Sequence, residues 1–501
     1  MRTIKKILIA NRGEIALRIM RTAREMNIAT VAVFSEADRK SPHVRYADEA
    51  VCIGPSPSSE SYLKGDKIIQ VCKELNVDAI HPGYGFLSEN AGFAKSVREA
   101  GIIFIGPSSE AIEIMGSKLA AKQAAGQYNI PMVPGTAYAI TDRDEAKLTA
   151  KEIGYPVLIK ASAGGGGKGM RVVDHEAEFD EQMNRAVSEA ATSFGDGSVF
   201  IEKYITSPKH IEIQILGDEH GNIIHLFERE CSIQRRHQKV VEEAPSISIS
   251  NETRTEMGRC AIDVARSCGY YGAGTVEFIV DEAGEFYFLE MNTRLQVEHP
   301  VTEQITGIDL VRQMIYIAEG KSLTFKQSDI RMHGHSIEVR VYAEDATNNF
   351  LPDVGKLTTY VKPDGNGVRV DDGFELGMDI PIYYDPMIAK LITFGANRTE
   401  AIEKMIRAIE EYKISGVQTT LPFCNFVMKH PVFLSGKFDT NFVTTHFKPE
   451  MLMMESDETV TMLAAVLSAQ IQLGSVIKSE MPKKDATENQ SPWKVSRLKN
   501  I

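Results

Sequence analysis

Paired cysteines and long hydrophobic runs are scarce in this sequence, and each shortage excludes a class of protein. The six cysteines form no Cys-x-x-Cys pair, which argues against a zinc site or a disulfide framework and favours a reducing cytoplasm. Residues 459–477 carry no ionisable side chain, but Thr, Ser, Gln and Gly dilute them, so a packed helix is predicted there instead of a membrane span. The N-terminus runs directly into a strand-like segment, so no signal peptide is predicted.

Positive charge is also in deficit. The net charge is −12 over 501 residues, so the chain is not expected to be a general nucleic-acid binder, and any phosphate chemistry must rely on local basic groups. Hydrophobic residues make up 43% of the chain and charged residues 25%, as in ordinary globular proteins. The length predicts about three domains.

The hydrophobic pattern changes along the chain. In the first part, strands are expected at 7–10, 30–34, 79–80 and 102–106 and helices at 14–27 and 66–75. This alternation predicts a doubly wound parallel sheet. Antiparallel hairpins are expected at 157–173 and 275–291, and short strands with a helix at 399–412 follow, which is an α+β arrangement. The polar, Lys-rich segment 478–501 is predicted to be mobile.

Four consecutive glycines and a lysine occupy residues 164–168, between two strand-like segments. Residues without side chains let backbone amides approach phosphate groups closely, and a lysine adds positive charge. No Ser or Thr follows Lys168, which excludes a Walker A loop, and a strand instead of a helix follows, which excludes a dinucleotide-binding turn. We interpret the segment as a hairpin flap over a nucleotide; a flexible surface hairpin is the alternative.

Two carboxylates are expected to face each other on the hairpin at 275–291. A turn centred on residues 283–284 places Glu277 opposite Glu290, and Phe278 opposite Leu289. Opposed side chains lie roughly 5 Å apart, so the two carboxylates repel each other unless a cation lies between them, and Mg²⁺ prefers such oxygen ligands. Asn292 continues on the same face. The alternative is a solvent-exposed hairpin face whose carboxylates pair with lysines.

Two further runs carry groups suited to an anion. Residues 235–239 contain four basic or potentially basic side chains, although such runs are commonly surface patches. Residues 294–300 follow the second strand of the hairpin directly. In that run, Arg294 offers a planar fork for a planar oxyanion such as bicarbonate, and Glu298 offers a base.

Taken together, these segments closely resemble the biotin carboxylases of the ATP-grasp superfamily. The matching runs are residues 9–16, 81–90, 163–169, 234–245 and 290–300, and the resemblance extends from residue 1 to about residue 446. It implies an N-terminal α/β domain over 1–115, a central ATP-grasp domain over 116–331 with a flap subdomain at about 132–204, and a C-terminal mixed α+β domain over 332–446. It leaves a helix and a tail over 447–501.

The resemblance also implies a role for each matching residue. The ATP ligands would be Lys118, Lys160, Gly166, Gly167, Glu202, Lys203, Tyr204, Ile205, His210 and His237. Glu277, Glu290 and Asn292 would hold Mg²⁺ or Mn²⁺, with two ions expected. Bicarbonate would bind at Lys239, Arg294, Gln296 and Val297. Glu298 would be the general base and Arg340 would bind biotin and stabilise its enolate, so the catalytic set is Arg294, Glu298, Lys239 and Arg340.

The implied reaction is the ATP-dependent carboxylation of biotin by bicarbonate through carboxyphosphate. No Ala-Met-Lys-Met biotinylation motif occurs in the chain, so the biotin is expected on a separate carrier protein, and a carboxyltransferase subunit is expected to pass the carboxyl group on. Acetyl-CoA, as in fatty acid biosynthesis, is the expected acceptor, with propionyl-CoA or pyruvate as alternatives. The resemblance suggests a cytoplasmic homodimer that binds neither nucleic acid nor membrane.

Three questions stay open in the sequence. Another ATP-grasp ligase that joins a carboxylate to an amine would share the nucleotide and metal residues, and a catalytically inactive ATP-binding subunit is a further alternative. Residues 459–473 are expected to form a helix that docks on a partner, and Trp493 is a candidate anchor for such a contact. A disordered appendage is the alternative for this tail.

Overall fold

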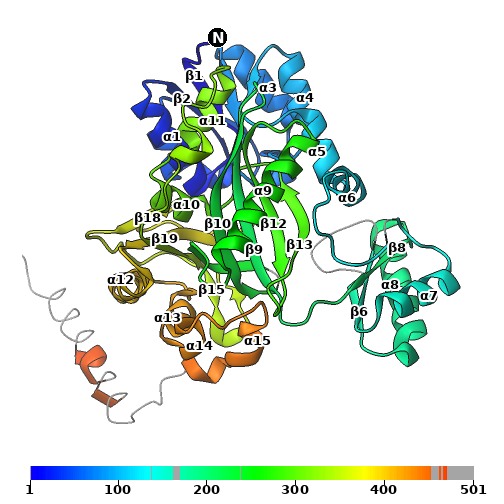
Figure 1. Cartoon of the computed structure of the whole chain (residues 1–501). Coiled ribbons are helices and arrows are strands. Elements are labelled where there is room, and N and C mark those ends of the chain that lie inside the picture. The colour runs from blue at the N-terminus through cyan, green and yellow to red at the C-terminus, as the bar shows by residue number, and fades with distance from the viewer. Residues whose placement is uncertain are drawn as a thin grey trace, which may run out of the picture. The chain divides into compact units, whose positions relative to one another are not determined.

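A computed structural model describes residues 2–136, 138–161, 170–236, 238–452, 462–463 and 466–470 (Figure 1). The chain divides into two units, Met1–Leu452 and Met453–Ile501. In the second unit, residues 462–463 and 466–470 are helical, as predicted for 459–473; the rest of that stretch and Trp493 lie outside the described residues. None of the described helices combines the length and the hydrophobicity that crossing a membrane requires.

The N-terminal part is a five-stranded parallel sheet in the order β3-β2-β1-β4-β5. Its strands are β1 (Lys6–Ile9), β2 (Ala29–Ser35), β3 (Glu49–Gly54), β4 (Ala79–His81) and β5 (Ile103–Phe104). The helices of this part and its junction with the next are α1 (Gly13–Glu25), α2 (Pro42–Tyr46), α3 (Gly65–Glu74), α4 (Ala91–Glu99), α5 (Ser109–Gly116) and α6 (Lys118–Gly126). The predicted doubly wound sheet is confirmed, whereas strand β3 and helices α2, α4, α5 and α6 were not predicted.

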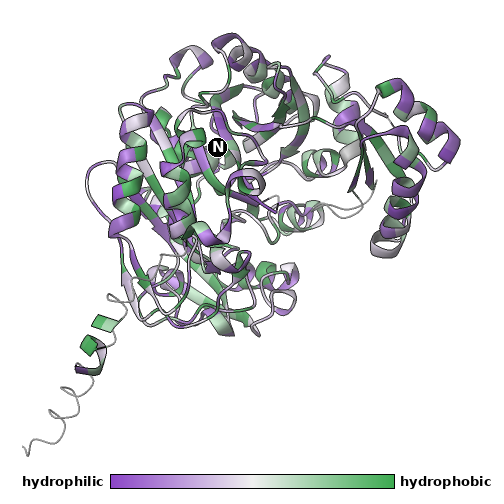
Figure 2. Cartoon of the chain, turned by 90° about the horizontal axis from the view of Figure 1, so that it is seen from below, coloured by the Kyte–Doolittle hydropathy of each residue, from purple (hydrophilic) through white to green (hydrophobic). Residues whose placement is uncertain are grey.

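Alternation along β1 shows why both faces of this sheet are covered. Ile7 and Ile9 belong to a core that includes α1, whereas Leu8 belongs to a separate core that includes α3. Successive side chains of a strand point to opposite faces, so a short apolar run places two residues in one core and one in the other. Hydrophobic residues lie along the strands, and the helices carry their hydrophilic residues on their outer sides (Figure 2).

An eight-stranded sheet in the order β13-β12-β9-β10-β11-β14-β19-β18 forms the centre of the first unit. Its first strands are β9 (Lys209–Gly217), β10 (Ile223–Arg235), β11 (Gln238–Ala244), β12 (Gly272–Val280) and β13 (Phe286–Asn292), and the helices that follow or cover them are α9 (Asn251–Ser267), α10 (His299–Thr306) and α11 (Leu310–Ala318). The sheet continues through β14 (His335–Tyr342), β19 (Met387–Gly395) and β18 (Val368–Asp372). The central and C-terminal parts therefore share one sheet, through the antiparallel pair β11–β14.

The smaller elements complete the unit. A three-stranded antiparallel sheet contains β7 (Met170–Val173), β6 (Val157–Ala161) and β8 (Val199–Lys203), with helices α7 (Arg143–Ile153) and α8 (Phe179–Phe194). The C-terminal part adds β15 (Glu344–Asp345), β16 (Leu351–Pro352), β17 (Thr359–Val361), β20 (Lys413–Ser415), α12 (Arg398–Glu411), α13 (Leu421–Lys429), α14 (Pro431–Leu434) and α15 (Phe442–His446). The predicted strands on either side of the glycine run are confirmed as β6 and β7, whereas residues 162–169 lie outside the described residues.

The carboxylate hairpin has the predicted partners at one position and different partners at the next. Glu277 of β12 is paired with Glu290 of β13, as expected. The register then shifts, and Phe278 pairs with Phe288 instead of Leu289. A β-bulge places one extra residue in β13 between these pairs, which a count of residues from the turn cannot detect. The prediction of Phe278 opposite Leu289 was therefore wrong, and the more important prediction of opposed carboxylates was correct.

Candidate functional site

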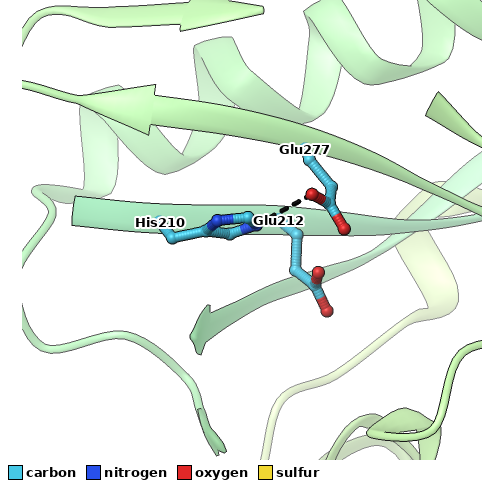
Figure 3. A group of neighbouring side chains, drawn as sticks. All are labelled: His210, Glu212 and Glu277. Carbon is cyan, nitrogen blue, oxygen red and sulfur yellow. Dashed lines mark ion pairs between the residues drawn. The ribbon is translucent and has the colours of Figure 1, made fainter. Parts of the chain in front are cut away.

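Strand β9 carries polar and apolar residues on opposite faces, and this alternation builds the floor of the site. Ile211 and Ile213 are fully buried in the core beneath α9. His210 and Glu212 alternate with them, so both point to the opposite face of the sheet. Figure 3 shows these two side chains beside Glu277 of the neighbouring strand β12.

The ammonium group of Lys239 lies at the centre of three carboxylates. Lys239 Nζ is 2.5 Å from Glu212 Oε2, 3.0 Å from Glu277 Oε1 and 2.8 Å from Glu298 Oε1. Burial alone would lower the pKa of this lysine, but the three carboxylates raise it well above its ordinary range. Lys239 therefore stays protonated in a buried setting, and an incoming anion can share its ammonium group.

Glu277 is held by neutral donors as well as by Lys239. The side-chain amides of Asn292 and Gln296 each donate a hydrogen bond of 2.8 Å to its Oε1. His210 Nε2 lies 2.9 Å from its Oε2, the contact dashed in Figure 3. Burial would raise the pKa of Glu277, but Lys239 and His210 hold it well below its ordinary range. Glu277 is therefore ionised at neutral pH.

Two sets of side chains that include Glu277 could hold a divalent ion. His210, Glu212 and Glu277 bring ligand atoms within 4.8 Å of one another, but one of these ligands is a nitrogen and both carboxylates already pair with the Lys239 ammonium group. Glu277, the more exposed Glu290 opposite it and the amide of Asn292 supply hard oxygen atoms on one face of the hairpin. This second donor set suits Mg²⁺ or Mn²⁺ better, because these ions prefer oxygen ligands.

Glu298 lies between two cations that belong to different strands. Its Oε1 accepts from Lys239 of β11 at 2.8 Å, and its Oε2 accepts from Arg340 Nη2 of β14 at 3.0 Å. Arg340 Nε also donates to Glu242 at 2.6 Å. Burial alone would raise the pKa of Glu298, but Lys239 and Arg340 hold it well below its ordinary range. A deprotonated carboxylate thus lies between two donors that an anionic ligand can compete for.

Arg294 lies at the edge of this cluster. Its Nε donates to Glu89 at 2.8 Å and its Nη2 donates to Asn292 Oδ1 at 2.9 Å. Glu89 also accepts a hydrogen bond from the backbone amide of Thr293, so the N-terminal part fixes the start of the 294–300 run. About a fifth of the Arg294 side chain remains exposed, which leaves the guanidinium accessible to a ligand.

A cavity of about 510 Å³ opens beside Glu298, a size typical of small-molecule sites. Its walls come from segments that lie far apart in the sequence, and residues 383–387 contribute to them as well. Glu14 and Tyr84 belong to the N-terminal part, Arg294 and Val297 to the run after β13, and Arg340 to β14. Four of the groups predicted for anion or cofactor chemistry, Arg294, Val297, Glu298 and Arg340, therefore lie in or directly beside one cavity.

Buried Glu202 of β8 forms a second charged group with Lys160 of β6 and Lys122 of α6. Glu202 Oε2 is 2.6 Å from Lys160 Nζ, and its other oxygen pairs with Lys122. Burial would raise the pKa of Glu202, but the two lysines lower it. The Lys203 side chain instead donates hydrogen bonds to the carbonyl oxygens of residues 154 and 155. The backbone amide of Tyr204 donates a hydrogen bond to the carbonyl oxygen of residue 156. Ile205, which follows directly, is half-buried.

The structure separates the basic run at 235–239 into different environments. Arg235 pairs with Glu344, and Arg236 donates to the carbonyl oxygen of Asn349. Of the described residues of this run, Lys239 alone pairs with the three carboxylates of the cluster. The structure therefore does not bring Arg235 and Arg236 together with Lys239 in one anion site. His237, Gly166, Gly167 and the Lys118 side chain lie outside what the structure describes.

Comparison with known proteins identifies the family. The family model described as "Biotin carboxylase, N-terminal domain" matches residues 3–112, "Carbamoyl-phosphate synthase L chain, ATP binding domain" matches 117–326, and "Biotin carboxylase C-terminal domain" matches 338–445. Biotin carboxylase 1 of Bacillus subtilis (strain 168) is 52% identical over 444 residues, which are 88% of this chain and 99% of the relative.

The chain belongs to the biotin carboxylase family.

Two solved structures and one longer relative are similar to this biotin carboxylase over most of its length. The biotin carboxylase domain dimer of Hydrogenobacter thermophilus 2-oxoglutarate carboxylase, solved with MgADP, ADP and bicarbonate, is 48% identical with a TM-score of 0.85, over 91% of this chain and 100% of that one. Biotin carboxylase of Campylobacter jejuni is 49% identical with a TM-score of 0.85, over 89% and 99%. The mitochondrial propionyl-CoA carboxylase alpha chain of Homo sapiens is 51% identical over 94% of this chain but only 66% of its own length.

Two residues that the sequence did not single out belong to the same cluster. Glu212 is a member of the Lys239 cluster, and Arg229 is a fully buried guanidinium that donates to Glu212 and Gln296. The alternation of polar and isoleucine residues over 210–215 would have predicted Glu212, because it lies on the same face as His210. No comparable pattern predicts Arg229, whose role depends on contacts with distant segments.

Proposed function

We propose that this biotin carboxylase carboxylates biotin on a separate carrier protein, using bicarbonate and ATP, as the first half-reaction of a biotin-dependent carboxylase. The observation that carries the proposal is the ionised Glu298 held between Lys239 and Arg340 beside the cavity. A base, an anion-binding lysine and an arginine from a third segment converge there. These are the groups that deprotonation and activation of bicarbonate require.

In the proposed reaction, bound bicarbonate competes with Glu298 for the positively charged Lys239 side chain. Lys239 and Arg294, with the Gln296 side chain and the Val297 backbone, bind the bicarbonate. A carboxyl group with a very low pKa is a weak base, but its basicity rises when Lys239 turns toward the bicarbonate. Glu298 then accepts the bicarbonate proton, and the dianion attacks the γ-phosphorus of ATP to give carboxyphosphate and ADP.

The nucleotide is proposed to lie between the three-stranded sheet and the carboxylate hairpin. Its ligands in this proposal are Lys118, Lys160, Gly166, Gly167, Glu202, Lys203, Tyr204, Ile205, His210 and His237. The Hydrogenobacter thermophilus relative was solved with MgADP and bicarbonate, which supports these substrates here. Glu277, Glu290 and Asn292 would hold Mg²⁺ or Mn²⁺, which supplies charge neutralisation for the phosphates.

Biotin is proposed to enter the cavity of about 510 Å³, where Arg340 stabilises its enolate while the enolate captures CO₂. Carboxyphosphate breaks down to this CO₂ and to phosphate, and the phosphate removes the ureido proton of biotin. Proposed partners are a biotin carboxyl carrier protein, a carboxyltransferase subunit and a second copy of the chain. Acetyl-CoA is the proposed final acceptor, although the relatives named above carry out propionyl-CoA and 2-oxoglutarate carboxylation by name.

The domain limits 1–115, 116–331, 332–446 and 447–501, and the flap at about 132–204, are part of the proposal. The six unpaired cysteines support a reducing, cytoplasmic location.

Steady-state ATP hydrolysis by the purified chain with Mg²⁺ tests this function. Bicarbonate and free biotin are added separately and together. We expect hydrolysis that depends on bicarbonate and rises further with biotin. Hydrolysis indifferent to both additions contradicts the proposal and favours another ATP-grasp ligase, and ATP binding without any hydrolysis favours an inactive subunit.

Arg340→Ala is expected to reduce biotin carboxylation by roughly 10²- to 10³-fold, the usual cost of one donor to an oxyanion. The biotin-independent, bicarbonate-dependent ATPase should fall by less, because it does not involve the enolate. Carboxybiotin formation and ATP cleavage are measured on the same enzyme preparation. Equal losses in the two assays contradict the proposed role of Arg340 at the enolate.

A further inference from the structure

Lys390 of β19 is a fully buried lysine to which the proposed reaction gives no role. Its side chain has no exposed surface, and its Nζ donates a hydrogen bond of 2.8 Å to the carbonyl oxygen of Val297. The same nitrogen is 3.4 Å from Glu14 Oε2 and 4.0 Å from Asp371 Oδ2. Burial of an ammonium group costs several kcal/mol unless its contacts replace water, so these three partners account for its position.

The hydrogen bond from Lys390 to Val297 lies next to Glu298, the proposed base. The Val297 carbonyl belongs to the planar peptide unit that joins Val297 to Glu298. Val297 lines the cavity, and Glu298 is the N-cap residue of α10. A hydrogen bond to this carbonyl therefore fixes the plane from which the Glu298 side chain extends toward Lys239 and Arg340.

The contact with Glu14 reaches the opposite wall of the cavity. Glu14 lies in the first turn of α1 and lines the cavity with its neighbour Tyr84. The hydroxyl group of Tyr84 donates a hydrogen bond to Glu14 Oε1, while Glu14 Oε2 faces Lys390. Tyr84 is thus connected to Lys390 through one carboxylate.

The sheet register explains why Lys390 reaches both walls. Lys390 pairs with Arg340 of β14 on one side and with Asp371 of β18 on the other. Directly opposed residues share a face of an antiparallel sheet, so Lys390 extends from the same face as Arg340. Glu338, also on that face, is buried, no described residue forms a hydrogen bond with its carboxyl oxygens, and burial raises its pKa well above the ordinary range.

We infer that Lys390 is a positioning residue of the carboxylation site, which holds the Val297–Glu298 peptide on one wall of the cavity and the Glu14–Tyr84 pair on the other. This inference rests on the proposed function, because it assigns Lys390 a purpose only if Glu298 and the cavity act in the reaction. Lys390 does not line the cavity itself and acts through these two contacts.

Lys390→Met tests the inference, since methionine fills a similar volume without charge or donor. We expect kcat/KM for bicarbonate to fall roughly 10- to 100-fold, as for a displacement of about 1 Å at a reacting group. The KM for ATP should not change, because the proposed ATP ligands do not contact Lys390. A purely structural role would lower the amount of folded enzyme without this difference between the two substrates.

Arg398→Met is the matched control. Arg398 is largely buried in the same C-terminal part and pairs with Glu243 through bonds of 2.7 and 3.0 Å, away from the cavity walls. It should lose stability without a change in either KM. If Lys390→Met resembles Arg398→Met in its kinetics, the positioning role is overturned. If the wild type itself lacks bicarbonate-dependent ATP cleavage, the proposed function fails instead.

Glu14→Gln covers the case in which Lys390→Met does not fold. Glutamine keeps an oxygen that accepts from Tyr84 but removes the charge that faces Lys390. Burial raises the pKa of Glu14 to about 7, so the assay is run at pH 8, where the wild-type carboxyl is ionised. We expect an increase of roughly tenfold in KM for free biotin and an unchanged KM for bicarbonate. An unchanged KM for biotin overturns the inference.

Discussion

Glu298→Gln is expected to lower bicarbonate-dependent ATP cleavage by roughly 10²- to 10⁴-fold, the usual contribution of a general base. Glutamine has nearly the same shape and still accepts from Lys239 or Arg340, but it cannot take the proton of bicarbonate. MgADP binding should be retained, because Glu298 lies beside the cavity and not in the proposed nucleotide site. Single-turnover ATP cleavage and MgADP titration on the same preparation give the two quantities.

Glu228→Gln provides the control for that substitution. Glu228 is also a buried glutamate of the central sheet and pairs with Arg254 at 2.8 Å, but it does not line the cavity. Its substitution should leave bicarbonate-dependent cleavage unchanged. Full activity of Glu298→Gln would show that the proton goes elsewhere and that the base is wrongly assigned.

Lys239→Met is expected to destabilise the protein by about 3–5 kcal/mol at pH 7 and to abolish the bicarbonate response. The substitution leaves Glu212, Glu277 and Glu298 buried together without their shared cation, and breaking a buried ion pair from one side costs about this much. Urea unfolding of the variant and the wild type, followed at several pH values, measures the loss.

The penalty should depend on pH in a direction that follows from the carboxylates. The pKa values of Glu277 and Glu298 lie well below the unfolded value of about 4.3, so their stabilisation is present above that pH and is lost as the pH falls through their folded pKa values. Without Lys239 these carboxyl groups protonate more readily. The difference in stability between variant and wild type should therefore shrink as the pH falls from 7 toward 4. A difference that stays constant would contradict the charged cluster.

The sequence predicted most of the fold because its periodic patterns are strong. Residues 7–10 and 14–27 have clear strand and helix periods, and β1 and α1 appear within two residues of those limits. Strand β3 and helices α2, α4, α5 and α6 were missed. Strand β3 is only partly buried and contains Glu49, so its apolar period is weak. The shift after Glu277 was invisible, because a β-bulge leaves no signature in the count of residues from a turn.

The site could be predicted only in part, since its residues come from strands far apart in the sequence. The register pair Glu277–Glu290 follows from local counting, whereas the link between Glu298 and Arg340 depends on β14 joining the sheet beside β11. Family resemblance supplied that connection before the structure did. Lys390 carries no sequence signal, because it lies in an otherwise apolar strand and its purpose depends on Val297 and Glu14.

The most direct test of the central claim follows oxygen from bicarbonate. The enzyme is incubated with ATP, Mg²⁺, biotin and ¹⁸O-labelled bicarbonate, and the released phosphate is analysed by mass spectrometry. Attack of a bicarbonate oxygen on the γ-phosphorus predicts one labelled oxygen in each phosphate, together with carboxybiotin. Phosphate that carries no label would show that water or another nucleophile attacks ATP, and would contradict carboxyphosphate formation at Glu298.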